Sequence, residues 1–421
     1  MAIKNQILSL QSLFISMAAV QLATAGSGTL VPLAFSEIGA SQEVASMAAS
    51  AYSAGFLVGC FVVARSIVDF GHIRAFAFGA AIAIAVAILF SVSTSTPFLV
   101  VLRFLSGLAT AGLFSIGDTW LNETAEERTR GSVLAVYSIV VGIVAVFSQF
   151  LVFVVPGDIR EAFVYVALFY CLSIVVISTT RSTPPNNDTP VPIRVRGLLK
   201  DAPAAAVGAF AIGMVSTTLL SVVPYSAAQL GIEIINVAIM VALIYLGRVL
   251  FQFPLGRLSD KMDRRIVILI ATVTATLVLF VMGILVDVDY DHSVNSFDYN
   301  SIGFVILSII LVLLGGSLLT LYSLLVAHAL DRTVPVFVSS AAVTMLLVWT
   351  LGSIAGPLIA NIATTYFGDI ALYWVNFAVM LCFALYLGQR VWSVEPVSRA
   401  EQTSHTDVLP TSTEMAPSEK R

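Results

Sequence analysis

The sequence is short of charge, which sets its class before any motif is considered. Only 11% of its 421 residues are charged and 58% are hydrophobic, whereas soluble domains carry about 25% charged residues. A soluble fold could not keep so much apolar surface away from water with so few charges. The composition therefore excludes a soluble globular protein.

Cysteine and histidine are also scarce. The three cysteines, Cys60, Cys171 and Cys382, all fall inside apolar runs, and the four histidines do not cluster with carboxylates. These patterns favour neither a disulfide framework nor a metal site nor an acid–base centre. We therefore predict no catalytic residue, no metal and no cofactor, and expect the chain not to be an enzyme. No basic stretch with interleaved aromatics is present, which argues against a nucleic acid partner.

Long apolar runs are what the sequence does contain. A membrane-spanning helix needs about 20 apolar residues, and twelve such runs can be placed. We predict an all-α membrane protein with transmembrane helices at residues 9–34, 43–64, 73–93, 96–121, 132–155 and 161–180, and then at 204–229, 234–256, 265–287, 302–330, 339–364 and 369–390.

The twelve runs divide into two sets of six. Residues 181–203 form a polar, proline-rich break, which predicts a cytoplasmic linker between six-helix bundles at 1–180 and 204–390. The residues at 65–73 match those at 257–265, and Leu113–Ser115 match Leu321–Ser323, so we expect pseudo-symmetric halves. Residues 391–421 are rich in Ser, Thr, Pro and Glu, which predicts a disordered cytoplasmic tail.

The placement of lysine and arginine indicates the orientation. With the amino terminus in the cytoplasm, Arg103 and Arg248 lie inside helices, Arg160 lies in an outside loop, and every other Lys and Arg lies on the cytoplasmic side. We predict a multi-pass protein of the bacterial inner (plasma) membrane with both termini cytoplasmic. Residues 23–25 resemble a signal-peptide cleavage site, but the apolar run continues to Leu33, which favours an uncleaved first helix.

Three stretches resemble motifs of the major facilitator superfamily. The segment from Gly256 to Arg265, GRLSDKMDRR, resembles its loop signature, with Asp263 where a second glycine is expected. The segment 103–107, RFLSG, is similar to the arginine–glycine motif of the fourth helix, and 352–357, GSIAGP, resembles the glycine–proline motif. Residues 120–123, 71–74 and 327–328 look most like a bacterial YcaD-like branch. The resemblance implies a twelve-helix transporter fold and no settled substrate.

The resemblance also implies a conformational latch. It assigns this role to Gly256, Asp260, Arg264 and Arg265, in a loop where Gly256 lets the chain turn as the eighth helix ends. Asp118, near the cytosolic end of the fourth helix, is expected to pair with a loop cation. The alternative is a plain positive-inside signal. We favour the latch because carboxylates at a membrane boundary are costly unless they are paired.

Two arginines fall inside predicted spans. Arg103 lies about 10 Å below the outer end of its helix, where it either contacts an anionic group or is a structural arginine satisfied by backbone carbonyls. The sequence leaves both open. Arg248 lies about 12 Å from the cytosolic end of the eighth helix and shares its face with Tyr245 and Gln252, which indicates a polar cavity wall.

Other polar residues within the spans predict a solute pathway. The candidates are Gln21, Tyr137, Tyr225 and Tyr322, with Thr24, Gln149 and Ser221 as weaker ones. Mid-depth carboxylates are absent, so only Asp118, Glu43 and His328 remain as candidates for proton coupling. Gly107, Gly352, Gly356 and Pro357 are expected to serve close helix packing.

These observations predict a secondary active transporter that moves a small organic solute across the lipid bilayer by alternating access. We expect a monomer, with proton coupling left open and a slight preference for an anionic solute because of the two arginines. A drug or metabolite efflux pump is the near alternative. A non-transporting membrane sensor is a further alternative, but it would need an output domain and none is visible.

Overall fold

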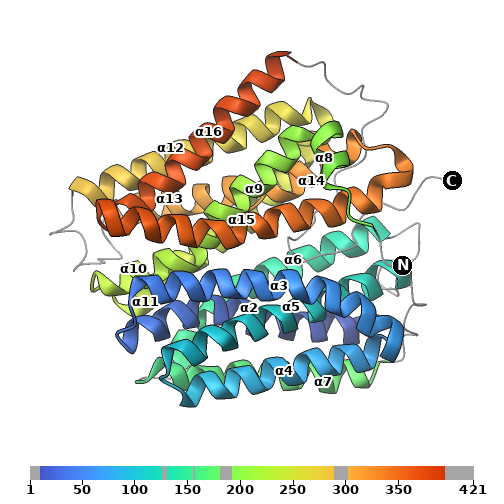
Figure 1. Cartoon of the computed structure of the whole chain (residues 1–421), viewed down its shortest axis with the longest axis vertical. Coiled ribbons are helices and arrows are strands. Elements are labelled where there is room, and N and C mark those ends of the chain that lie inside the picture. The colour runs from blue at the N-terminus through green and yellow to red at the C-terminus, as the bar shows by residue number, and fades with distance from the viewer. Residues whose placement is uncertain (1–9, 126–129, 155–156, 181–191, 289–301, 394–421) are drawn as a thin grey trace.

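The structure is a computed structural model that describes residues 10–125, 130–154, 157–180, 192–288 and 302–393. Twelve helical spans within these ranges are long and apolar enough to cross a membrane. The predicted all-α membrane fold is thereby confirmed (Figure 1). The first part of the predicted linker, residues 181–191, and nearly all of the predicted tail fall outside the described residues.

The first six spans follow the predicted order. They are α2 (Gln11–Glu37), α3 (Gln42–Phe70), α4 (His72–Val92), α5 (Thr96–Thr124), α6 (Arg130–Ser148) continued by the 3-10 helix η1 (Gln149–Val154), and α7 (Ala162–Ser178) preceded by the 3-10 turn η2 (Ile159–Glu161). A short helix, α8 (Val195–Asp201), precedes the second set.

The second set contains two spans with an interrupted α-helix. Its members are α9 (Pro203–Thr217) with a π-helical turn η3 (Thr218–Val222) and α10 (Val223–Gln229), then α11 (Ile234–Lys261), α12 (Arg264–Val288), α13 (Ile302–Leu318) with α14 (Leu321–Asp331), α15 (Val338–Phe367) and α16 (Ala371–Ser393). The apolar runs of the sequence predict a continuous helix in each case, because such runs carry no signal for a π turn or a short break.

The helices lie side by side in two groups, with α2 to α7 in the lower part of Figure 1 and α9 and α12 to α16 in the upper part. The assembly has two ends. We call the end with Gln11, Phe70, Lys261, Asp331 and Ser393 the terminal end, and the end with Glu37, Gln42, Gln229, Ile234 and Phe367 the distal end. The limits of the two halves at 180 and 204 stay a prediction.

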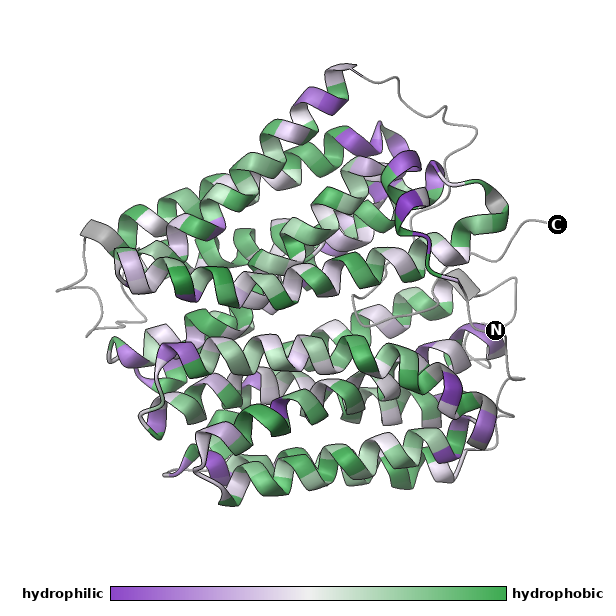
Figure 2. Ribbon diagram, in the orientation of Figure 1, coloured by the Kyte–Doolittle hydropathy of each residue, from purple (hydrophilic) through white to green (hydrophobic). Residues whose placement is uncertain are grey.

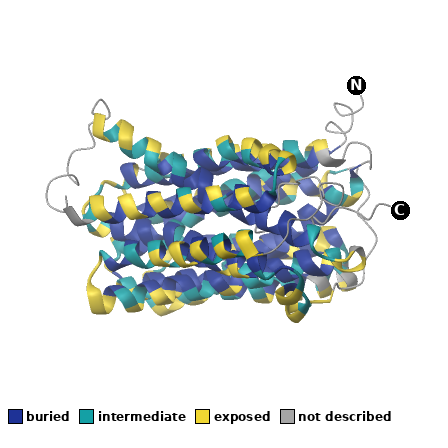
Figure 3. Cartoon of the chain, turned by 90° about the horizontal axis from the view of Figure 1, so that it is seen from above, coloured by how far each residue is buried: buried dark blue, intermediate teal, exposed yellow. Residues whose placement is uncertain are grey.

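The surface of the bundle suits a lipid environment. Figure 2 shows hydrophobic residues along the length of the helices and hydrophilic ones gathered near both ends. Exposed residues follow the outward faces of the peripheral helices (Figure 3), and they include the large apolar side chains Phe78, Leu168 and Leu385. An apolar belt with polar ends is what a bilayer requires of its proteins.

Glycines set the closest helix contacts. A Cβ atom on Gly107 of α5 would meet the carbonyl oxygen of Tyr52 on α3, and one on Gly352 of α15 would meet that of Phe210 on α9. Gly356 faces Met214 of α9 in the same way, and Pro357 lies buried in the same helix. Small residues allow this backbone approach in membrane helices.

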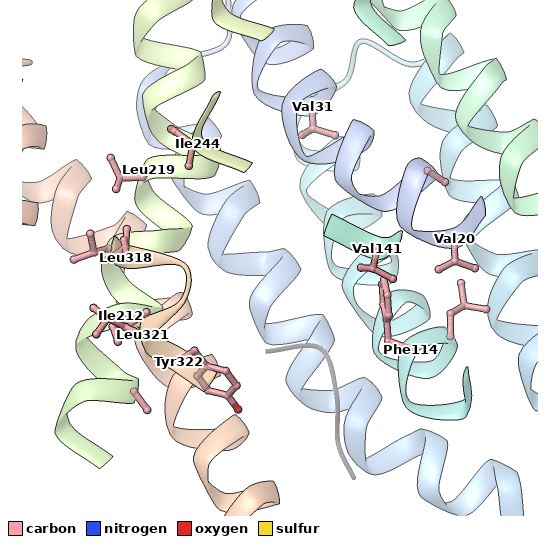
Figure 4. Packing of buried hydrophobic residues seen from close by; sticks show 14 of the residues in the cluster. Val20, Val31, Phe114, Val141, Ile212, Leu219, Ile244, Leu318, Leu321 and Tyr322 are labelled. Atoms are coloured by element: carbon pink, nitrogen blue, oxygen red, sulfur yellow. The ribbon is translucent and has the colours of Figure 1, made fainter. Parts of the chain in front are cut away.

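The two groups meet along specific helix pairs. α3 packs against α15, α6 against α11, and α2 against α10. In Figure 4 the labelled core residues form one group around Ile212, Leu318 and Leu321 and another around Phe114 and Val141. Tyr322 lies on the side of its group that faces the other (Figure 4).

Candidate functional site

A cavity of about 200 Å³ lies between the two groups of helices. Its wall takes residues from both, which fits a site at the interface of two bundles. The polar and aromatic side chains in the wall include Gln21, Thr24, Tyr52, Arg103, Ser106 and Tyr170 from the first half, and Ser216, Ser221, Tyr245, Arg248, Tyr322 and Trp349 from the second.

Arg103 is held in this wall by the packing of α5 on α3. Gly107, one turn further along α5, brings the backbone at Tyr52 against the helix. The Tyr52 ring then covers the guanidinium group, with Cζ of Arg103 4.4 Å from the ring centroid. The side chain is 5% exposed, and among the described residues it has no hydrogen-bond partner, with Nε fully buried. The structural alternative, an arginine satisfied by backbone carbonyls, is not what this geometry contains.

Arg248 faces the same cavity from α11. Because α11 continues to Lys261 rather than ending near residue 256, Arg248 lies near the middle of its helix and deeper than its predicted position about 12 Å from the end. Gly247 beside it allows the backbone of α13 at Val312 to approach. No carboxylate pairs with Arg248 in the part of the chain that the structure describes.

The cavity carries positive charge without a counter-charge. Arg103 and Arg248 are the charged side chains of its described wall, which contains no carboxylate. Within the same residues, the hydroxyl groups of Tyr245 and Tyr322 have no protein hydrogen-bond partner. A site between two bundles with two cations and hydroxyl donors attracts an anionic group.

Gln21 and Tyr322 also lie in this wall, as their polar character predicts, but two other pathway candidates do not. Tyr137 on α6 is buried and donates a hydrogen bond to Oδ1 of Asp118, 2.9 Å away on α5. The prediction that it lines the cavity is wrong. A tyrosine in a membrane helix can satisfy its hydroxyl against a neighbouring helix of its own half, and the sequence does not show which way it points.

Tyr225 is the second correction. It lies in α10 at the distal end and donates to the carbonyl of Ala40, in the turn between α2 and α3. It therefore joins the two halves and does not line the cavity. Two other hydrogen bonds between the halves lie at this end, from Gln42 to Thr364 and from Gln229 to Ser36. Ser50 donates to the carbonyl of Ile354 further along the two helices.

Of the predicted latch residues, Asp260, Arg264 and Arg265 lie at the terminal end of the second half. Asp118 lies in α5 of the first half, where it accepts a hydrogen bond from Tyr137. Gly256 is a correction, because α11 continues past it and it does not form a turn. Arg264 at the start of α12 contacts Asp260 of α11 and Asp331 at the end of α14, with N···O distances of 3.2 and 2.6 Å. The predicted set did not include Asp331. The repeat that matches Leu113–Ser115 with Leu321–Ser323 also matches Glu123 with Asp331, and this could have identified it.

Asp263 gives the departure from the family motif a physical reason. It precedes α12 and accepts hydrogen bonds from the backbone N–H of Arg265 and from its guanidinium group. It thus caps the helix and pairs with a cation of the first turn. In the described ranges, no group of three or more His, Cys, Asp or Glu is placed to hold a metal ion.

The family comparison matches nearly the whole chain. A family model described as the Major Facilitator Superfamily matches residues 13–203 and 205–416. Among similar curated proteins, the uncharacterized MFS-type transporter YcaD of Salmonella arizonae is 23% identical over 368 residues, covering 87% of this chain and 91% of that protein. The MFS-type transporter YfkF of Bacillus subtilis is 25% identical over 284 residues, covering 64% and 72%.

Solved structures share the fold at low identity. The nucleoside transporter NupG superposes with a TM-score of 0.74 and 12% identity, covering 91% of this chain and 99% of that one. The peptide transporter POT gives 0.70 and 13%, covering 91% and 94%. An inward-facing, occupied bacterial homologue of the lysosomal transporter Spinster gives 0.68 and 13%, covering 94% and 98%.

Proposed function

The chain belongs to the Major Facilitator Superfamily and is a membrane transporter, and from that premise we propose that it carries a small anionic organic solute by alternating access. One observation carries the choice of solute. Arg103 and Arg248 reach one cavity from different halves, and no carboxylate shares its described wall. A cation within a membrane span costs up to several kcal/mol, depending on its surroundings. An anionic solute would offset that cost.

The chemistry of the wall supports a carboxylate or a similar oxyanion. A guanidinium group can donate two parallel hydrogen bonds to a carboxylate. The hydroxyl groups of Tyr245 and Tyr322 add further donors, and the Trp349 ring beside Tyr322 supplies apolar contact. The cavity volume of about 200 Å³ sets the size class at a small metabolite.

Alternating access requires an interface that can open at either end. The hydrogen bonds of Tyr225, Gln229 and Gln42 across the halves support a state that is closed at the distal end. The group formed by Asp260, Arg264 and Asp331 at the terminal end is the part of the second half that we assign to the latch.

The remaining parts of the proposal concern placement. We place the chain in the bacterial inner membrane as a monomer, with the terminal end and both termini in the cytoplasm. The supporting observation is the charge bias of the sequence, in which Arg160 is the lone basic residue of the predicted outside loops. We assign no chemical step to the protein, because a carrier releases its solute unchanged.

A thermal-shift screen tests the choice of solute. The purified protein is heated with matched sets of anionic, neutral and cationic metabolites at one concentration and ionic strength. We expect the anionic set to contain the compounds that raise Tm, since ligand binding to the folded state stabilises it. Hits are then tested for uptake into proteoliposomes. Stabilisation by cationic compounds alone would reject the proposal.

A further inference from the structure

A second, smaller pocket lies at the terminal end of the second half, away from the central cavity. It encloses about 10 Å³, enough for one water-sized group. The start of α9 forms one side of it, and four basic or imidazole side chains form the rest. The lining residues are Ala202, Pro203, Ala204, Arg265, His328, Arg332 and Arg390.

Three guanidinium groups from different elements crowd this pocket. Arg265 belongs to the first turn of α12, Arg332 follows α14, and Arg390 lies near the end of α16. Arg265 is paired with Asp263, whereas Arg390 makes no ion pair with any described residue. Burial lowers the pKa of Arg332, and the neighbouring charges of Arg265 and Arg390 lower it further. The pocket therefore holds more positive than negative charge.

His328 supplies a buried polar group with unused capacity. Its side chain is 4% exposed, and across the described ranges it has no hydrogen-bond partner. Because the imidazole lines the pocket, a ligand oxygen placed there would satisfy it.

The start of α9 adds to the positive potential of the pocket. The amino-terminal end of a helix carries a partial positive charge. In the first turn of α9, Pro203 has no N–H and the N–H groups of Ala205 and Ala206 donate to the carbonyl of Ala202, which leaves the N–H of Ala204 without a partner within the helix. Here that end lies beside the three arginines. Amino-terminal ends of helices commonly bind phosphate groups. Hydrophilic residues gather at this end of the upper group in Figure 2.

We propose that this pocket binds a phosphate oxyanion, with His328, Arg332 and Arg390 as its direct partners. The space admits one oxygen of the phosphate and leaves the rest of the molecule outside, so a phosphate at the tip of a larger molecule fits as well as inorganic phosphate. The two sources are an anionic lipid headgroup of the adjoining leaflet and a soluble phosphate. Basic residues at a cytoplasmic membrane surface attract the first of these.

The test measures stabilisation of the full-length protein by two probes. In detergent, sodium phosphate is titrated against sodium chloride of equal ionic strength. In nanodiscs, phosphatidylcholine alone is compared with phosphatidylcholine that contains phosphatidylglycerol. We expect at least one probe to raise Tm, which supports the site, and the probe that does so identifies the source.

Variants then locate the effect. Arg390→Gln and Arg332→Gln should each raise the half-saturating concentration of that probe roughly tenfold, the loss expected for one charge-assisted hydrogen bond. His328→Gln is a third variant in case Arg332→Gln does not fold. Arg257→Gln is the matched control, because Arg257 lies at the same end of the molecule against the Phe253 ring and does not line the pocket.

Two results would overturn the proposal. One is the absence of any Tm increase with either probe. The other is an equal loss of the Tm increase in Arg257→Gln, which would mean that the probe stabilises the protein through its surface charge in general. Neither result depends on transport or on the central cavity, so the assignment of an anionic solute is tested separately.

Discussion

The guanidinium group of Arg264 lies 2.6 Å from the carboxylate of Asp331, and the two side chains are only 1% and 2% exposed. The first belongs to the start of α12 and the second to the end of α14, so the pair joins two spans that a sequence of more than sixty residues separates. Asp260 of α11 contacts the same guanidinium group. One arginine therefore ties together the terminal ends of three helices.

The buried pair makes a strong prediction for stability. Asp331→Asn keeps the shape of the side chain but leaves the Arg264 charge without its closest partner. Removing one member of a buried ion pair costs about 3–5 kcal/mol. We expect a clear fall in Tm in detergent, and a partial recovery in the double variant Asp331→Asn with Arg264→Gln, which removes the uncompensated charge.

The pair at the distal end provides the control. Asp158 and Arg160 are joined over a shorter distance than Arg264 and Asp331, but their side chains are 34% and 24% exposed. Pairs in contact with water contribute about 0–1 kcal/mol. Asp158→Asn should therefore change Tm little. If it lowered Tm as much as Asp331→Asn, burial would not be what makes the Arg264–Asp331 pair important.

The helix count could be predicted from the sequence because length and hydropathy alone decide whether a helix can cross a bilayer. The carboxyl-terminal end of α11 could not be predicted in this way. Gly256 and the charges after it suggest a loop, yet the helix continues to Lys261, where Arg264 of the next helix contacts Asp260. That contact depends on the meeting of two helices in space, which local composition does not encode.

The candidate site was predictable only in part for a similar reason. Arg103 and Arg248 stand out because a charged side chain within an apolar run usually faces the bundle interior or a water-filled cavity rather than lipid. A tyrosine carries no such constraint, and Tyr137 and Tyr225 both satisfy their hydroxyl groups outside the cavity. Which face of a helix meets its own half and which meets the other is decided by packing, and a single sequence does not reveal it.

The contact of α5 with α3 predicts that Gly107 tolerates no side chain. In Gly107→Ala the added Cβ would lie 1.9 Å from the carbonyl oxygen of Tyr52, so the two helices must separate. Overpacking of this kind costs about 1–3 kcal/mol. We expect a lower Tm and also weaker binding in the cavity, because the Tyr52 ring that covers Arg103 moves with α3.

Gly388→Ala is the matched substitution. Gly388 lies within α16 and a Cβ atom there would have nothing within 4 Å. Alanine is the better helix former by about 1 kcal/mol, so Tm should stay the same or rise. An equal fall in Tm for both variants would count against the close-contact explanation.

The hydrogen bond from Tyr225 to Ala40 predicts a conformational effect. Tyr225→Phe removes a donor that crosses the halves at the distal end. A hydrogen bond contributes about 1 kcal/mol, so the ratio of distal-closed to distal-open molecules should fall about fivefold. The measurement is the rate at which an impermeant thiol reagent, added from the distal side, labels Gly28→Cys in a variant whose three native cysteines are replaced.

Gly28 suits this reporter because it lines the cavity and has open space around its Cα atom. Tyr366→Phe serves as the control, because Tyr366 lies at the same end and is 78% exposed. Labelling that is faster in Tyr225→Phe and unchanged in Tyr366→Phe supports closure at the distal end. Unchanged labelling in both would show that the bond does not hold this end closed.

Asp263 predicts an acid-dependent loss of stability. Burial alone would raise the pKa of its carboxyl group, but hydrogen bonds from Arg265 outweigh burial and hold that pKa below its usual value of 3.8. A group whose pKa is lowered by folding stabilises the folded state above its unfolded pKa, and this contribution is lost as pH falls through the folded value. Stability from Asp263 should therefore be constant from pH 7 to about 5 and decline below about 4.

Asp263→Asn isolates this contribution from that of other carboxylates. The amide oxygen can still accept from the backbone N–H of Arg265, so the helix cap is retained while the charge is removed. Tm is measured against pH for both proteins. We expect the variant to be less stable at pH 7 and the difference to shrink below pH 4. A difference that is independent of pH would contradict a role for the charge.

The two arginines of the central cavity give the prediction on which the proposed function depends most. Arg103→Gln and Arg248→Gln each remove a cation from a wall whose described residues include no carboxylate. Loss of a charged hydrogen bond to an anionic solute costs about 1.5–3 kcal/mol, so the half-saturating concentration of an anionic hit should rise at least tenfold. Arg257→Gln, which keeps the cavity intact, should leave it unchanged.

Analogues separate recognition from structure. If Arg103 binds the anionic group, a neutral amide analogue of the hit should bind the native protein weakly and should lose nothing further in Arg103→Gln. If Arg103 only supports α5, both compounds should lose affinity together. Tm without ligand adds a second criterion. The guanidinium group has no hydrogen-bond partner among the described residues, and it contacts the Tyr52 ring. Removing its charge loses a cation–π contact of about 1–2 kcal/mol but also removes a buried cation, so Tm of the empty protein should change little.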